Sequence, residues 1–424
     1  MGRYLPCCRL APNEMEFTRR QLAAAGATAV GGALVGSALW DAHLLCPDPA
    51  TPAWDLDDAE ALQSMHFGYW GPPVLAGDAA YVTQGHGIVA GGSGVLARVD
   101  RESGSVRWTV DREPAGFGTP NAVDDVVYAP TGQNELLALD AADGAVRWRV
   151  DAGVSETDTG ESFALDQPVA TDVGVVVQTF QGPTANAFDG EHAVAGVETA
   201  TGEVAWTRSL PARARAVGAG GGDVLVAAED GSVQRLDAAT GDVRWRETVA
   251  GTPRPIRSRD ASATLALVVD DDTVIGVDAT EGSVAWRASV PPADQGLGET
   301  PTPVPNAVVG GGLVLAGRGD GSVVAHALQS GERRFRYDAG APTFAVDVNP
   351  DEGVAVAMDA RGFAHVLDVT DGSRTGRVAT APRDSGETCG YRVREAYRRM
   401  RYVTVDADGA FVAAHGVARF GLPG

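Results

Sequence analysis

The most constraining feature of this 424-residue sequence is a short motif that recurs seven times. In its full form an acidic residue is followed four residues later by glycine and four residues after that by tryptophan. Five copies are complete: Asp100, Gly104 and Trp108; Asp140, Gly144 and Trp148; Glu198, Gly202 and Trp206; Asp237, Gly241 and Trp245; Asp278, Gly282 and Trp286. Two copies are degenerate: Ala327, Gly331 and Phe335; Asp368, Gly372 and Gly376. Repeats bury their surfaces against their neighbours, so we expect an array of units rather than one compact core.

The spacing and chemistry of the motif predict the strands and turns of one repeat. Successive motif glycines are separated by 40, 58, 39, 41, 49 and 41 residues, and about 40 residues accommodate four short strands with their turns. Apolar residues alternate before and after each turn, as in 136–140 and 145–150, which predicts two flanking strands. The acid can accept backbone N–H bonds, glycine supplies a positive φ, and the tryptophan can dock on the neighbouring unit. These residues are therefore predicted to be structural rather than catalytic.

The pattern L-D-A-x-T-G-x-V-x-W, seen in full at 236–245, resembles the pyrroloquinoline-quinone-type propeller repeat. That repeat occurs in quinoprotein dehydrogenases and in BamB-like outer-membrane assembly factors. The resemblance covers residues 70–376 and, more weakly, 377–424. It implies an all-β, eight-bladed β-propeller of four-stranded blades, and the abundant glycine (54 residues) suits its many turns.

Seven motifs leave one blade to be built from the rest of the chain. Residues 402–414 read as two strands around an Asp-Gly turn, 416–421 can form a third, and 52–57 imitate the outer strands of the other blades. We therefore expect a propeller over 53–424 in which both ends of the chain pair and leave no long exposed edge. Cys46 and Cys389 would flank this closure, and a disulfide between them is a hypothesis.

The N-terminal region reads as an export address. Arg19 and Arg20 precede an uncharged stretch, 22–40, that is rich in Ala, Gly and Val. This is the layout of a twin-arginine signal, so we predict a signal or membrane anchor over 1–40 and a linker over 41–52. Cleavage and retention both stay open, as does a start at Met15. The predicted location is extracellular or on the outer face of the cell membrane.

The charge balance excludes some partners. The chain carries a net charge of −22, and all 34 of its basic residues are arginine. Nucleic acid and anionic membrane surfaces would repel it. Acidity together with the absence of lysine predicts adaptation to molar salt, where self-repulsion is screened; a genome rich in G and C is the alternative explanation.

Few residues suggest chemistry. The third repeat carries acidic insertions, 155–162 and 181–192, and the sixth carries 291–305, but none has the spacing of a calcium loop. His326 and His365 sit at different offsets from their motif glycines, which disfavours a shared metal site. We interpret the densest basic run as a solvated face or an internal salt-bridge partner for the acidic surface rather than as an anion site; it comprises Arg392, Arg394, Arg398, Arg399 and Arg401. We predict no catalytic residue and no metal.

Two functions remain in consideration. The favoured one is a monomeric, non-catalytic binding or scaffolding propeller, without a cofactor, whose loops meet an unidentified protein or cell-surface partner. The alternative, implied by the resemblance, is a quinoprotein dehydrogenase that uses pyrroloquinoline quinone with calcium. In that family adjacent cysteines cover the quinone, whereas here the adjacent Cys7 and Cys8 precede the arginine pair of the predicted export signal.

Overall fold

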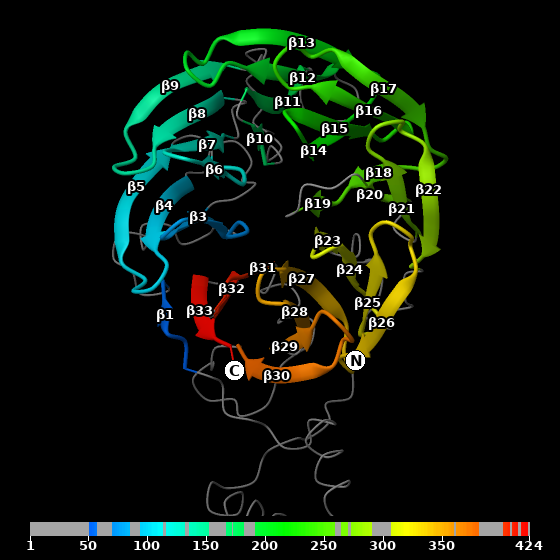
Figure 1. The fold of residues 1–424 in the computed structure, drawn as a ribbon. Helices are drawn as coiled ribbons and strands as arrows, with labels where there is room; N and C mark the ends of the chain where they lie inside the picture. The colour runs from blue at the N-terminus through cyan, green and yellow to red at the C-terminus, as the bar shows by residue number, and fades with distance from the viewer. Residues whose placement is uncertain are drawn as a thin grey trace, which may run out of the picture.

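The fold is a closed ring of eight β-sheets around a central opening (Figure 1). The computed structural model describes residues 51–56, 70–84, 94–112, 116–131, 135–151, 167–171, 173–181, 191–258, 264–269, 273–290, 307–359, 362–380, 402–407, 409–413 and 417–422. Every helix or strand assigned within these ranges is a strand. The predicted all-β, eight-bladed propeller is confirmed.

Blades are numbered in chain order, and the strands of each follow from the central opening outward. Blade 1 contains β2 (Val74–Ala76), β3 (Ala79–Gln84), β4 (Gly94–Asp100) and β5 (Val106–Arg112). Blade 2 contains β6 (Asn121–Val123), β7 (Val126–Pro130), β8 (Glu135–Asp140) and β9 (Val146–Asp151). Blade 3 contains β10 (Val169–Ala170), β11 (Val175–Gln181), β12 (Glu191–Val197) and β13 (Val204–Leu210). Blade 4 contains β14 (Ala214–Gly220), β15 (Asp223–Ala228), β16 (Ser232–Asp237) and β17 (Val243–Thr248).

The second half of the ring continues the pattern. Blade 5 contains β18 (Pro253–Pro255), β20 (Thr264–Val269), β21 (Thr273–Asp278) and β22 (Val284–Ser289). Blade 6 contains β19 (Arg257–Ser258), β23 (Ala307–Gly310), β24 (Leu313–Gly317), β25 (Ser322–Ala327) and β26 (Arg333–Asp338). Blade 7 contains β27 (Thr343–Asn349), β28 (Val354–Asp359), β29 (Phe363–Asp368) and β30 (Arg374–Ala379). Blade 8 contains β31 (Tyr402–Val405), β32 (Gly409–Ala413), β33 (Val417–Gly421) and β1 (Trp54–Asp55).

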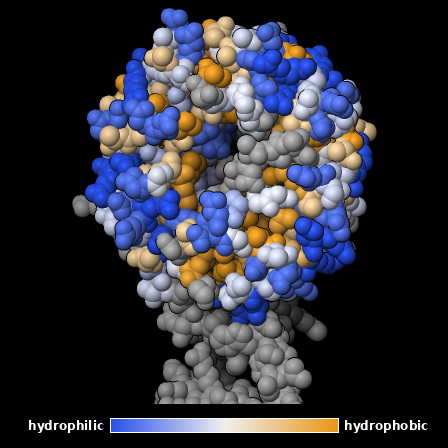
Figure 2. Space-filling view, viewed as in Figure 1, coloured by the Kyte–Doolittle hydropathy of each residue, from blue (hydrophilic) through white to orange (hydrophobic). Residues whose placement is uncertain are grey.

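Burial changes from the middle of a blade to its outer strand. Every residue of β3 and β15 is buried, because neighbouring blades cover both faces of these strands. The outer strand β9 alternates exposed and half-buried residues. Apolar residues accordingly gather around the central opening and hydrophilic ones at the periphery (Figure 2). Each outer strand from β5 to β30 carries at least one arginine, which protects its free edge against pairing with another sheet.

The two ends of the chain build blade 8 together. Trp54 pairs with Arg419 and Asp55 with Ala418, so β1 adds antiparallel to β33 as the outer strand. The predicted closure by both termini is confirmed.

Hydrogen bonds tie blade 8 to both of its neighbours. Thr404 donates its hydroxyl to the carbonyl of Pro73 at 2.9 Å, and the Val405 N–H donates to Asp347 of blade 7 at 2.8 Å. Arg101 of blade 1 pairs with the buried Asp406 at 3.1 Å. Within the described part of the chain, the seam is thus closed by polar contacts as well as by strand pairing.

Blade 6 departs from the expected four strands. After β18 the chain continues through the buried Ile256, and β19 then pairs in parallel with the inner strand β23. A segment of one blade therefore covers the inner edge of the next. Motif spacing does not reveal this addition, because it involves only two residues and a partner about 50 residues away.

Antiparallel pairing gives the ring two different rims. On one, the turn rim, lie the connections between the first and second and between the third and fourth strands of a blade. On the other, the loop rim, lie the connections between the second and third strands and between successive blades. The motif turns all lie on the turn rim.

Candidate functional site

In six of the seven motif turns an acid and a glycine of the motif hold the turn, and blade 6 has Ala327 in place of the acid. In blade 4 the Asp237 carboxylate accepts the N–H groups of Ala239 at 2.9 Å and Thr240 at 3.0 Å. Gly241 has a φ of +72°, and its N–H donates to the Asp237 carbonyl at 2.9 Å. The hydrogen bond from the Thr240 N–H is the largest of the effects that lower the pKa of Asp237. The acid therefore stays ionised as a turn cap.

The motif tryptophan of one blade covers the motif turn of the next. The Trp206 indole N–H donates to the Ala238 carbonyl at 3.0 Å, and its ring lies over Gly241. A Cβ on Gly241 would lie 2.5 Å from that ring, so only glycine fits there without displacing it. Trp54, Trp108, Trp148, Trp206, Trp245 and Trp286 make the same bond, at 2.7 to 3.0 Å, to the carbonyls of Arg101, Ala141, Thr199, Ala238, Ala279 and Leu328. The structure thus brings these sequence-selected residues together at the interfaces between blades.

The interface between blades 6 and 7 and the interface between blades 7 and 8 lack this indole bond. Phe335 covers Gly372 of blade 7 but has no N–H to donate. In blade 7 the aromatic position is Gly376. The turn that an aromatic residue would cover is interrupted in blade 8, because β33 and β1 come from opposite ends of the chain. The ring closure therefore accounts for the degenerate seventh motif.

A β-bulge precedes the aromatic position in every blade from 1 to 7. In blade 4, Arg235 pairs with Trp245 and Leu236 pairs with Val243, which leaves Arg244 as the extra residue. A bulge redirects a side chain, and here Arg244 reaches the turn acid Asp237. Arg107 and Asp100 in blade 1, at 2.7 Å, and Arg147 and Asp140 in blade 2, at 2.8 Å, repeat the ion pair. Sequence analysis missed this pairing, although an Arg seven residues after the acid is visible in the motif.

The connections on the loop rim vary more in length than those on the turn rim. The third-to-fourth-strand connections are nearly constant, for example 101–105 and 198–203. The connections between blades range from 211–213 and 249–252 to 152–168, 290–306 and 380–401. The insertions expected in the third and sixth repeats both join strands that end at the loop rim. Most of their residues lie outside the described part of the chain.

One buried hydrogen-bond chain links blades 6 and 7. The His365 ring, 1 % exposed, places Nδ1 2.8 Å from the Tyr337 hydroxyl and Nε2 3.2 Å from the buried Asp359 carboxylate. Arg374 donates to the Tyr337 oxygen at 3.3 Å, and the Phe363 N–H donates to Asp359 at 3.0 Å. Burial lowers the pKa of His365, and the opposing effect of Asp359 is smaller. Uncharged His365 thus connects the two blades.

The two strand histidines have separate roles. His326 Nδ1 lies 2.9 Å from the Gly331 carbonyl of its own blade, whereas His365 bonds to Tyr337 and Asp359. No group of three or more His, Cys, Asp or Glu side chains able to hold a metal occurs among the described residues.

Several sequence-based hypotheses fall outside the described residues. They are the signal or anchor over 1–40, the Cys46–Cys389 disulfide, the adjacent Cys7 and Cys8, and the arginine run over 392–401. Within the residues that are described, no helix is long and apolar enough to cross a membrane.

Comparison with known proteins identifies a family that matches most of the chain. The family described as outer membrane protein assembly factor BamB matches residues 32–179, 155–375 and 264–415. No curated protein matches the sequence.

Among solved structures, BamB from Moraxella catarrhalis has 17 % identity and a TM-score of 0.56, covering 88 % of this chain and 98 % of its own. The computationally designed Ika8 protein has 12 % identity and a TM-score of 0.60, covering 85 % and 98 %. Quinohemoprotein alcohol dehydrogenase from Comamonas testosteroni has 13 % identity and a TM-score of 0.55, covering 84 % and 73 %. At these identities the likeness shows the fold alone.

Proposed function

Because the chain belongs to the family described as outer membrane protein assembly factor BamB, we propose that it is a non-catalytic binding or scaffolding propeller for a protein or cell-surface partner. The observation that carries the proposal is the difference between the two rims. On the turn rim the motif residues are used in turns and blade interfaces. On the loop rim the connections vary from 211–213 to 380–401. Variable loops on a rigid scaffold are where binding surfaces usually form.

The cellular setting is part of the same proposal. Export by the twin-arginine route would place a monomeric ring outside the cell or on the outer face of its membrane, either free or held by an uncleaved anchor. The net charge of −22 and the absence of lysine support a saline environment. The family match supports a binding role in general and no specific partner, because one fold hosts many functions.

The experiment sets binding against catalysis. Purified full-length protein is incubated with pyrroloquinoline quinone and Ca²⁺, and quinone absorbance and dye-linked oxidation of alcohols are recorded. We expect neither saturable uptake nor turnover. Saturable uptake with turnover would overturn the proposal in favour of a quinoprotein dehydrogenase, the class of the Comamonas testosteroni enzyme.

A second measurement addresses the partner. The full-length protein, tagged at its C-terminus, is used for cross-linking and pull-down from the native cell surface in high salt. A variant whose 152–166 segment is replaced by a Gly-Ser linker serves as the comparison. We expect a specific protein to be captured by the parent chain and lost with the variant. Equal capture by both would remove this part of the loop rim from the binding surface.

A further inference from the structure

Blade 6 breaks an ion-pair arrangement that blades 1, 2 and 4 share. In blade 4 the bulge residue Arg244 pairs with Asp237, the acid of the third-to-fourth-strand turn. It also lies 3.5 Å from Asp223, which begins the second strand at the same rim. In blade 2, Arg147 likewise pairs with Asp140 and, at 2.6 Å, with Asp125. Two carboxylates from neighbouring turns thus neutralise one bulge arginine.

The same bulge is present in blade 6 without the two acids. Ala325 pairs with Phe335 and His326 with Arg333, so Arg334 is the extra residue. The turn acid is replaced by Ala327, and the connection before β24 consists of Gly311 and Gly312. The backbone still forms the shared turn, because the Gly331 N–H donates to the Ala327 carbonyl at 2.8 Å.

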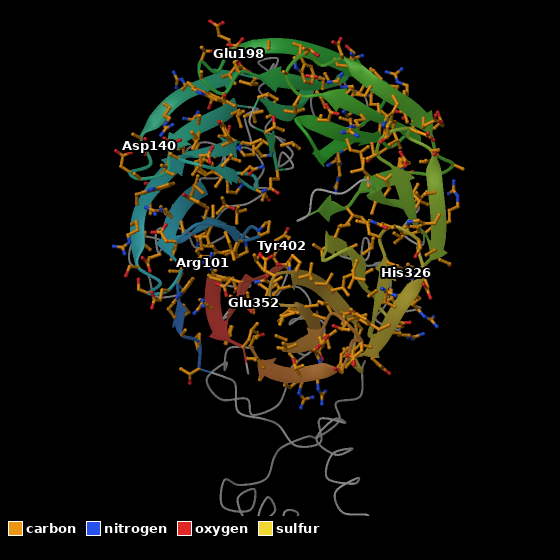
Figure 3. The ribbon with its side chains drawn as sticks, in the orientation of Figure 1. Arg101, Asp140, Glu198, His326, Glu352 and Tyr402 are labelled. Atoms are coloured by element: carbon orange, nitrogen blue, oxygen red, sulfur yellow. The ribbon has the colours of Figure 1, made fainter. Side chains whose placement is uncertain are left out.

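The arginines of this position are left to solvent. Arg333 and Arg334 are both exposed, and within the described part of the chain neither guanidinium has a hydrogen-bond or ion-pair partner. Arg336 differs, because it lies 3.4 Å from Asp320 near the loop rim. Figure 3 shows His326, the register partner of Arg333, on the outer part of blade 6, apart from Glu352 of the neighbouring blade. Two adjacent guanidinium groups are therefore exposed on a chain of net charge −22.

We propose that Arg333 and Arg334 bind a carboxylate side chain of a partner protein in the place that Asp237 and Asp140 occupy in their own blades. This assignment rests on the proposed binding role and supplies a surface and a chemistry for it. A guanidinium presents a fork of donors that matches a carboxylate. The rest of the acidic surface repels acidic segments, so an Asp-bearing or Glu-bearing segment would be directed to this position. Glu332 directly precedes β26 and Asp338 is its last residue, so neighbouring acids reduce the local net charge.

The alternative is a purely structural role, in which these arginines only protect the outer edge of β26 against sheet pairing. Edge protection needs charge but no particular neighbour. If the arginines only protect the edge, an acid introduced at position 327 should change the net charge by one unit and leave the binding of an acidic partner unchanged. If they bind a carboxylate, the introduced acid should itself pair with them and so weaken the binding of that partner.

The test uses the full-length chain and a fluorescein-labelled hexa-aspartate peptide, with binding followed by fluorescence anisotropy in low salt and in high salt. The wild type should bind saturably. Ala327→Asp should restore the internal ion pair and weaken binding roughly tenfold. The double variant R333Q/R334Q should weaken it at least as much. The matched control is R149Q/R287Q, which removes two exposed arginines from blades 2 and 5 and should bind like the wild type.

The outcomes separate this proposal from others. A327D binding as well as the wild type, no saturable binding by the wild type, or an equal loss in R149Q/R287Q would each overturn it. Melting curves control for folding, and A327D should melt at or above the wild-type temperature because its new acid also caps the turn. Alcohol oxidation with the quinone would overturn the non-catalytic role, whereas an unaffected A327D would overturn only the carboxylate site.

Discussion

A motif glycine meets two demands at once. Gly241 adopts a φ of +72°, which side chains rarely tolerate, and it lies under the Trp206 ring. Gly221 has a similar φ of +62° but nothing within 4 Å of where its Cβ would be. The two positions therefore separate the cost of backbone strain from the cost of displacing the tryptophan. Turn chemistry in the sequence predicts the positive φ. The lack of space for a Cβ depends on the tryptophan of the neighbouring blade.

Substitution of these glycines by alanine tests that separation. Gly221→Ala should lower the free energy of unfolding by about 1–2 kcal/mol through backbone strain alone. Gly241→Ala should lose that amount and about 1–3 kcal/mol more, because the Trp206 ring must move. Urea denaturation of both variants measures the difference. Equal losses would show that the tryptophan does not confine the glycine.

At the scale of the element, strands and turns follow from local pattern but their exceptions do not. Alternation around the motif predicts the strands on either side of each turn, such as β8 and β9. The bulge that directs Arg244 to Asp237 is a property of register, and register depends on pairing with β16. The parallel strand β19 and the bond from Tyr337 to His365 depend instead on a neighbouring blade, which no local pattern reveals.

The interface between blades 6 and 7 should respond to pH. Burial holds the pKa of His365 below its ordinary value, so as the pH falls the unfolded chain takes up the proton first. Stability is therefore full above about pH 6.5 and decreases below it, by at most about 1.4 kcal/mol per pH unit for one proton. Chemical denaturation between pH 7.5 and pH 5 should show a steeper loss for the wild type than for His365→Gln.

Tyr337→Phe provides the control for that experiment. It removes the hydroxyl that bonds to His365 Nδ1 but leaves the imidazole buried. We expect a loss of about 1 kcal/mol at every pH and an unchanged pH dependence. A wild-type slope that persists in His365→Gln would assign the effect to another group.

At the scale of the whole molecule, the ring is closed by an outer strand from one end of the chain and three strands from the other (Figure 1). This leaves blade 8 as the one blade without a continuous turn between its third and outer strands. It also explains why position 376 needs no aromatic residue. Connectivity, rather than packing, distinguishes this blade.

Circular permutation tests this interpretation. In the permuted chain, residue 422 is joined to residue 53 by the blade 4 turn sequence 238–242. The new ends lie within 182–190. We expect this chain to fold into the same ring. In that permutant Gly376→Trp should raise the melting temperature, because its indole then has a turn to cover. In the natural order the same substitution should bring no gain. A gain in both would show that the interrupted turn is not the reason for Gly376.

Salt should stabilise the ring. The net charge of −22 produces self-repulsion that screening relieves, since the Debye length falls to about 3 Å at 1 M. The exposed ion pairs of the turn rim weaken in salt, but such pairs contribute only about 0–1 kcal/mol each. We therefore expect the melting temperature to rise from low to molar salt. An unchanged or lower value would contradict the predicted adaptation to salt.

The amino-acid sequence alone determines the repeat, the turn chemistry, the four-stranded unit and the closure by both ends, because these depend on residue type, spacing and periodicity. Only the tertiary structure decides what crosses between blades: the tryptophan that confines the next glycine, the histidine held by Tyr337, and the strand added to blade 6. It also shows that Arg334 is the bulge residue of blade 6, the position from which Arg244 pairs with Asp237 in blade 4. Such contacts join residues that the motif spacing keeps apart, and their energy depends on which surfaces the closed ring brings together.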